Sequence, residues 1–221
     1  MLFILDNKYQ TVGVMDSNLP NGCPFFNDTH HARLLNGYNT LTFSVPANHE
    51  TAGLIEVEGY IIYTNNRDGY ELFRVKNITE QHGEEVTKSV SCEPSATHDL
   101  ITKRIRPVTF TSQNVETIIS QLLTGSGWEL GEVHFSGVST IEINDYPTAL
   151  DAIHTIISKF NVEIEFKVDF DGTKVRRKII NLYEKRGEQT DIVFEYGRNL
   201  VGVTREESTN QLYTAMVAVG N

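Results

Sequence analysis

The stretch NDYPTALDAIHTIISKFNVEIEFKVDFDGTKVRRKIINLYEKRG, residues 144–187, is the best-formed unit of the sequence. Its first part predicts an amphipathic helix that begins at Asn144 or Asp145. Pro147 then falls in the first helical turn, where its missing N–H is tolerated. The apolar face of this helix recurs at helical spacing and consists of Leu150, Ile153, Ile157 and Phe160.

The second part of the stretch predicts a hairpin. Apolar and charged residues alternate strictly from 162 to 168, the pattern of a half-buried strand, with Glu163 and Glu165 on the wet face. Asp171-Gly172 supplies the positive φ values that a tight turn needs. The pattern therefore indicates a helix packed on a hairpin, and it implies no reaction.

Another helix is predicted over residues 111–124, started by Thr111 or Ser112 and stopped by Gly125 or Gly127. Short strands follow in WELGEVHF and STIEI. Residues 107–187 are thus predicted to form an α+β unit of two helices on a small sheet. The apolar face of the helix 111–124 consists of Val115, Ile118, Ile119, Leu122 and Leu123.

Short strands separated by turn formers recur through residues 1–94, a pattern typical of a barrel or sandwich. Leu41, Phe43 and Val45 alternate with hydroxyl residues in one such strand. The sequence also predicts a strand pair within 54–64 and a bulge within 70–78. A short helix is expected over 95–105, with Ser95 or Thr97 as its N-cap.

The sequence becomes β-like again from Asp191 and ends at Asn221 in mid-strand. We expect a fragment of a longer protein, whose last strands rejoin the first domain. The predicted domains are a β-barrel over 1–106 plus 188–221, incomplete at its C-terminus, and an inserted α+β domain over 107–187. The predicted fold class is therefore α+β and β-dominated, a split antiparallel β-barrel with a two-helix insertion.

Composition narrows the classes of function. Of 221 residues, 19 are basic and 29 acidic, and the net charge of −10 argues against gripping nucleic acid. DNA passing nearby without binding is compatible with that charge. No run of apolar residues is long enough for a membrane-spanning helix, and the N-terminus is not a signal peptide, so a cytosol-like compartment is expected.

Residues that could carry chemistry are sparse. Cys23 and Cys92 are expected to be reduced thiols, and no zinc-binding spacing occurs. His30-His31 is predicted to be a solvated loop pair, and Trp128 is predicted to cap the core of the insertion. The basic run at residues 176–178 is read as a strand edge. The sequence therefore predicts no catalytic, cofactor-binding or metal-binding residues.

The ordered pattern of segments resembles the N-terminal part of phage tail hub proteins, also called tail-associated lysins, prophage endopeptidase tail proteins or minor structural proteins. The Glu93-Pro94 dipeptide departs from the family pattern, in which a His is expected near the strand end. The segments that carry the resemblance are LNGYNTLTFSVP (35–46), GYIIYTNNRDGYELFRV (59–75), SCEPSATHDLITKRIRPVTFT (91–111), LLTGSGWELGEV (122–133), ALDAIHTIISKF (149–160) and NLVGVTREESTNQLYTAMVAVGN (199–221).

The resemblance implies a homotrimeric hub at the distal end of a phage or prophage tail, whose barrels continue the hexameric tail tube. Its partners would be distal tail and tail tube proteins and the tape measure protein, with DNA passing through unbound. The hub would be assembled in the bacterial host cytoplasm and reside in the virion. Peptidase or muralytic activity belongs to C-terminal domains of this family, so no catalytic residue transfers to this segment.

Two other functions remain open at this point. One is a cell-wall peptidase or hydrolase within the segment itself, which would need paired catalytic groups. The other is a carbohydrate-binding tail module, which would need an aromatic-lined groove. Spike hubs of type VI secretion systems are expected to share the architecture.

Overall fold

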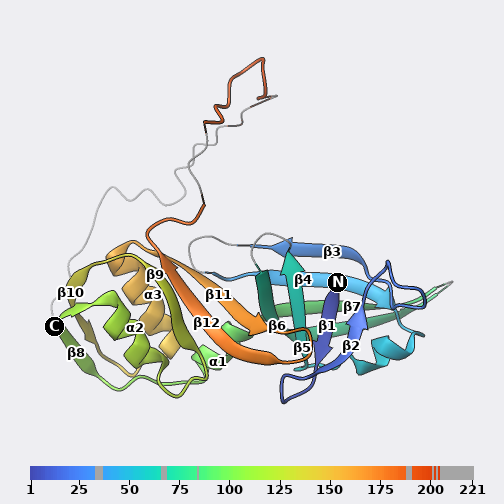
Figure 1. The fold of residues 1–221 in the computed structure, drawn as a ribbon, viewed down its shortest axis with the longest axis horizontal. Helices are drawn as coiled ribbons and strands as arrows, with labels where there is room; N and C mark the ends of the chain where they lie inside the picture. Colours follow the sequence, from blue (N-terminus) through green and yellow to red (C-terminus); the bar gives the residue numbers. More distant parts are fainter. Residues whose placement is uncertain are drawn as a thin grey trace, which may run out of the picture. The chain divides into compact units, whose positions relative to one another are not determined.

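The computed structural model describes residues 1–32, 37–65, 69–83, 85–187 and 191–200, together with Gly202 and Thr204. The chain divides into two compact units, Met1–Arg186 and Gly187–Asn221. The first unit combines a large curved sheet with a layer of helices (Figure 1).

β-Strands are the main regular structure of the first unit. Its strands are β1 (Leu2–Leu5), β2 (Thr11–Met15), β3 (Phe26–His31), β4 (Thr40–Pro46), β5 (Tyr60–Asn65), β6 (Gly69–His82), β7 (Val86–Pro94), β8 (Val108–Asn114), β9 (Glu129–His134), β10 (Val138–Ile143), β11 (Glu163–Phe170) and β12 (Val175–Tyr183). The main sheet runs β2-β1-β5-β6-β11-β12-β9, and a second branch runs β6-β7-β4-β3. Strands β8 and β10 pair separately.

Strand β1 is buried on both faces because a hydrophobic core lies on each side of it. Leu2 and Ile4 contribute to a core formed with the branch β4-β7. Phe3 and Leu5 contribute to the other core, which is formed with the helices and β11–β12. A strand with two apolar faces reads as a continuous apolar run, which explains the unalternated sequence LFIL.

The main sheet curls until the start of its edge strand β2 meets the β11–β12 turn. The backbone N–H of Thr11 donates to the carbonyl of Thr173 at 2.8 Å, and that of Val175 donates to the carbonyl of Tyr9 at 3.1 Å. Inside the curl, the ring of Phe170 lies 4.9 Å from that of Phe3. The predicted β-dominated α+β fold with a barrel-like sheet is therefore confirmed.

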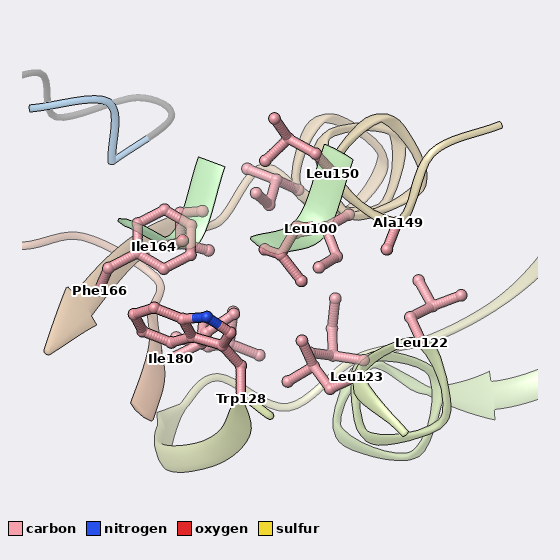
Figure 2. Packing of buried hydrophobic residues seen from close by; sticks show 14 of the residues in the cluster. Leu100, Leu122, Leu123, Trp128, Ala149, Leu150, Ile164, Phe166 and Ile180 are labelled. Atoms are coloured by element: carbon pink, nitrogen blue, oxygen red, sulfur yellow. The ribbon is translucent and has the colours of Figure 1, made fainter. Parts of the chain in front are cut away.

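Helices α1 (Ser95–Ile101), α2 (Val115–Leu123) and α3 (Ala149–Phe160) pack together beside the hairpin β11–β12. The predicted apolar faces are confirmed, since all five face residues of α2 are buried, as are Leu150, Ile153 and Ile157 of α3. Phe160 is partly buried against the same core. Figure 2 shows leucines of α1, α2 and α3 converging on Trp128, Ile164 and Phe166.

The predicted start of α2 at Thr111 or Ser112 is wrong, because both residues belong to β8, at the bulge where its register with β10 shifts. The helix begins after Asn114, whose side-chain oxygen accepts the backbone N–H of Thr117 at 2.8 Å. At its other end, the ammonium of Lys103 donates to the carbonyl of Leu122 at 2.8 Å. The side chain thus satisfies an orphan carbonyl of the last turn.

The predicted start of α3 at Asn144 or Asp145 is also wrong. Asp145 and Tyr146 have φ values of 62° and 49°, which are incompatible with a right-handed helix. Thr148 is the N-cap instead, and its hydroxyl oxygen accepts the backbone N–H of Asp151 at 3.0 Å. The cap lies after Pro147, so the proline precedes the helix.

Two further details differ from expectation. Helix α1 has Pro94 at its N-cap position with no side-chain hydrogen bond, so neither Ser95 nor Thr97 caps it. The strand pair predicted within 54–64 is one strand, β5, preceded by the 3₁₀-helix η1 (Glu50–Leu54). The predicted bulge is confirmed, because the β6–β7 register shifts between Val75 and Asn77.

In the second unit, residues 191–200 form a turn with an isolated bridge between Tyr196 and Leu200, and not the strand predicted there. The strands predicted further on fall mainly outside the described residues. The proposed division into 1–106 plus 188–221 and 107–187 therefore stays a prediction.

Candidate assembly surface

The described residues show little that could perform catalysis. They contain no group of three or more His, Cys, Asp or Glu side chains that could hold a metal ion. Cys23 and Cys92 are free thiols, 1% and 0% exposed, and burial raises the pKa of both. A protonated, buried thiol is a poor nucleophile. The prediction of two reduced cysteines is confirmed.

His30 and His31 lie in β3, and the predicted solvated loop pair is wrong. The ring of His30 packs 4.8 Å from that of Tyr63, and its Nε2 lies 3.5 Å from the carboxylate of Glu71. His31 is exposed. Successive side chains of a strand point to opposite faces, so the two imidazoles cannot share a ligand.

A polar cluster forms around Asp99 of α1. Its Oδ2 accepts the indole N–H of Trp128 at 2.9 Å and the ammonium of Lys178 at 2.7 Å. The ammonium also lies 5.0 Å from the ring centre of Tyr9 and 5.3 Å from that of Trp128. The side chains of Asp99 and Lys178 are only 14% and 11% exposed. This cluster joins α1, β12 and the segment before β9.

The predicted role of Trp128 as a cap on the core is confirmed by its burial, since the residue is 4% exposed. Its ring meets Phe166 edge-on, with 5.6 Å between ring centres. Sugars stack on accessible aromatic faces, and this ring offers none. The carbohydrate-binding alternative therefore gains no support from Trp128.

A cleft of about 930 Å³ opens beside the Asp99 cluster. Each cation in its wall already has a carboxylate partner. Arg176 pairs with Asp171 at 2.6 Å, Arg177 pairs with Glu129, and Lys178 pairs with Asp99. The cations are therefore neutralised in place. The cleft is lined by Tyr9, Ser120, Leu123, Thr124, Gly125, Gly127, Trp128, Glu129, Leu130, Val175, Arg176, Arg177 and Lys178.

Sequence reasoning missed a second polar network, because Glu165 does not face water as predicted and is 7% exposed. Its carboxylate accepts hydrogen bonds from the ammonium of Lys167 at 3.0 Å, from the hydroxyl of Tyr183 at 3.2 Å and from the guanidinium of Arg186. The register that follows from the Asp171-Gly172 turn could have revealed this network, because it places polar Asn181 opposite Glu165. Similarly, a buried Trp128 required an acceptor for its N–H, which Asp99 provides.

Exposed apolar side chains gather around a different cleft, of about 500 Å³, next to η1. Val12, Leu54 and Val57 are 47%, 44% and 54% exposed there. A Cβ atom built on Gly13 would lie 3.0 Å from Leu54, so that side chain lies directly on β2. We call this feature the Leu54 cleft. Its rim is mostly acidic, with Asp6, Glu56 and Glu58 opposed by Arg74.

Edge strand β3 is a second feature suited to assembly. Among the described strands it pairs only with β4, and most of its residues are exposed. An unpaired edge is a template for another chain. An exposed strand edge and an apolar cleft on a β-dominated chain are features of an assembly component.

Comparison with known protein families agrees with that class. The model of the prophage endopeptidase tail N-terminal domain matches residues 3–94, and that of the prophage endopeptidase tail domain matches residues 102–179. Together the two matches span more than half of the chain. The chain belongs to the prophage endopeptidase tail family and is a phage tail structural protein.

A solved structure shows the same fold. A prophage tail protein, gp18 from Listeria monocytogenes EGD-e, aligns at a TM-score of 0.58 with 13% identity, over 90% of this chain and 56% of that protein. The chain therefore spans about half the length of this structural relative.

Two looser matches have TM-scores below 0.5 and support no inference about this chain. The c3393 protein of the E. coli type VI secretion system aligns at 0.49 with 11% identity, over 83% of this chain and 49% of that one. A tail protein from Neisseria meningitidis MC58 aligns at 0.48 with 10% identity, over 71% and 44%. No curated protein sequence matches significantly. Among the described residues, no helix is long and apolar enough to cross a membrane.

Proposed function

We propose that this chain is the N-terminal structural part of a homotrimeric hub at the distal end of a phage or prophage tail. Three copies would close or extend the tail tube and carry host-wall-acting domains that follow in the full-length protein. The matches to two consecutive tail domains carry this proposal. Distal tail, tail tube and tape measure proteins would be its neighbours, after assembly in the bacterial cytoplasm.

The proposal assigns subunit association to the Leu54 cleft. A self-associating protein must cover apolar surface that a monomer would leave in water. Three apolar side chains, each close to half exposed, surround one concavity here. The strands around the cleft, β1, β2 and β5, are held rigidly because two cores flank them.

Light scattering coupled to size exclusion tests this assignment. We expect a trimer, either from this chain or from the chain with its C-terminal continuation restored. The double variant Leu54→Asp/Val57→Asp should then elute as a monomer, because two carboxylates would have to be buried beside an acidic rim. Val138→Asp is the matched control, since Val138 is 66% exposed on β10, and it should leave the trimer intact.

A stable dimer of both polypeptides would contradict the trimer. A trimer that survives the double variant would contradict the role of the Leu54 cleft while leaving the hub function standing. Antibody labelling of virions tests the position, and label anywhere other than the tail tip would overturn it. A lysis band in a peptidoglycan zymogram of this segment would revive the hydrolase alternative.

A further inference from the structure

The outward face of β4, β6 and β7 is built from short, uncharged polar side chains. The cross-strand register places Asn77, Ser91 and Thr42 in one row. Thr79, Ser89 and Ser44 form the next row, and the hydroxyls of Ser44 and Ser89 lie 3.0 Å apart. We call this surface the hydroxyl face, which comprises Thr29, Thr42, Ser44, Asn77, Thr79, Ser89 and Ser91.

Charged residues of the same strands are engaged elsewhere. Lys88 is 7% exposed, and its ammonium donates to the carbonyl of Ala52 at 2.8 Å and lies 3.3 Å from Glu80. Lys76 pairs with Glu58 at 2.8 Å. The chain is 22% charged, and the exposed face of a sheet is where charged side chains are ordinarily placed. Two successive rows without charge therefore require a reason.

The surface is also shallow and wettable. A hollow of about 270 Å³ lies over the rows. Most of the face is exposed, with Thr42, Asn77, Thr79 and Ser89 open to solvent. The next row along the strands pairs Arg74 with Glu93, which marks where the uncharged region ends. On the edge strand β3, Asp28 adds an exposed negative charge, and Phe26, opposite Ser44, is 36% exposed.

A surface past which a polyanion moves must satisfy three conditions. It carries no free cation, because each phosphate contact releases counterions and adds affinity. It exposes no aromatic ring on which bases could stack. It stays hydrated, so that no apolar contact holds the moving molecule. A surface covered by a protein partner has the opposite composition, enriched in aromatic residues, Met and Arg.

We propose that the hydroxyl face is a wall of the tail channel, the surface that double-stranded DNA passes without binding. This inference rests on the proposed hub function and names the face that meets the DNA. The uncharged side chains of β4, β6 and β7 meet all three conditions above, in a chain of net charge −10. The exposed ring of Phe26 lies beyond them, on the edge strand β3.

Cysteine accessibility tests the inference directly. The two native cysteines are buried, so a single exposed cysteine is the reactive one. Ser89→Cys reports on the hydroxyl face, and Thr109→Cys, exposed on β8, is the control. In the free chain both variants should react with a small maleimide and with a maleimide on a polymer wider than the tail channel.

In phage particles that have released their DNA, Ser89→Cys should react with the small reagent and not with the polymer. Reaction with both reagents would place the face on the outer surface and overturn the inference. Reaction with neither would make it a contact with another protein and overturn it equally. Antibody labelling of the same tails tests the hub function separately, because that function predicts the chain at the tail tip. Label at the tip with the wrong cysteine reactivity would overturn only the inference about the hydroxyl face.

Charge variants give a second readout. Thr79→Lys/Ser89→Lys should slow triggered DNA release several-fold, because two cations would face the phosphates. The matched variant Thr79→Glu/Ser89→Glu should release DNA at the wild-type rate. Equal rates for the Lys and Glu variants would overturn the inference.

Discussion

The hydroxyl face and the hairpin β11–β12 are both antiparallel β-surfaces, and they treat charge in opposite ways. The hairpin places Glu165, Arg177 and Lys178 on its strands and gives each an oppositely charged partner. The central rows of the hydroxyl face carry no charge at all among the described residues. The ion pairs of the hairpin hold neighbouring elements together, whereas an uncharged polar surface offers no ion pair to another molecule. We call the paired region around Asp99, Lys178 and Trp128 the joint.

The largest effect is expected at the joint. Asp99→Ala should lower the free energy of unfolding by on the order of 3 kcal/mol, because it leaves the ammonium of Lys178 and the indole N–H of Trp128 without their acceptor. Urea denaturation measures this. Glu129→Ala, which removes the half-exposed partner of Arg177, is the control and should leave stability nearly unchanged. Equal losses for the two variants would show that burial does not decide the strength of these pairs.

A smaller effect is expected at high pH. Burial and the neighbouring Tyr9 raise the pKa of Tyr60 from 10.0 to about 12. Because the folded value is the higher one, the fold favours the protonated phenol. Its contribution to stability is complete below pH 10 and is lost as the pH rises through 12.

Tyr60→Phe should therefore flatten the fall in the free energy of unfolding between pH 10 and 12. Denaturation curves across that range measure it. Tyr146→Phe is the control, because that side chain is 58% exposed. An unchanged slope in Tyr60→Phe would show that the buried phenol does not govern alkaline unfolding.

The smallest effect on stability is expected on the hydroxyl face. Ser44→Val/Ser89→Val should change the free energy of unfolding by only about 0.5 kcal/mol, since both residues face outward. It should nevertheless lower the solubility of the free chain, because it creates an apolar row on an exposed sheet. Dynamic light scattering at increasing concentration measures this. Unaltered self-association would show that the rest of the face suffices to keep it non-adhesive.

Local periodicity predicted the elements well and their boundaries poorly. The apolar faces of α2 and α3 follow from spacing alone, because a stripe at helical period has one way to be buried. The starts of both helices depended on context. Thr111 and Ser112 are good caps by residue type, but both lie in β8, which runs on to Asn114 beside β10. The residue types Asp145 and Tyr146 do not by themselves predict two successive positive φ values.

Polar residues were the harder problem. The alternation of apolar and charged residues predicted that Glu165 faces water. That pattern reflects only the order of residues along one strand, and it does not show which side chains lie on the neighbouring strand. The ammonium of Lys167 and the guanidinium of Arg186 supply the missing partners and make burial tolerable. By contrast, the uncharged rows were visible in the sequences TLTFSVP and VTKSVSCEP. Only the register of β4, β6 and β7 showed that they share one face.

The meeting of β2 with the β11–β12 turn has a consequence for biosynthesis. The hydroxyl of Thr11 donates to the carbonyl of Gly172, across 161 positions of the chain. At ordinary rates of translation, the first strands wait roughly ten to thirty seconds for these partners to emerge. During that time the run LFIL lacks the cover that the helices and hairpin later give to one of its faces. The strands that are synthesised first thus gain their last partners only near the end of translation. Because these contacts join residues far apart in the sequence, we expect this unit to fold slowly and to be prone to aggregation on the ribosome.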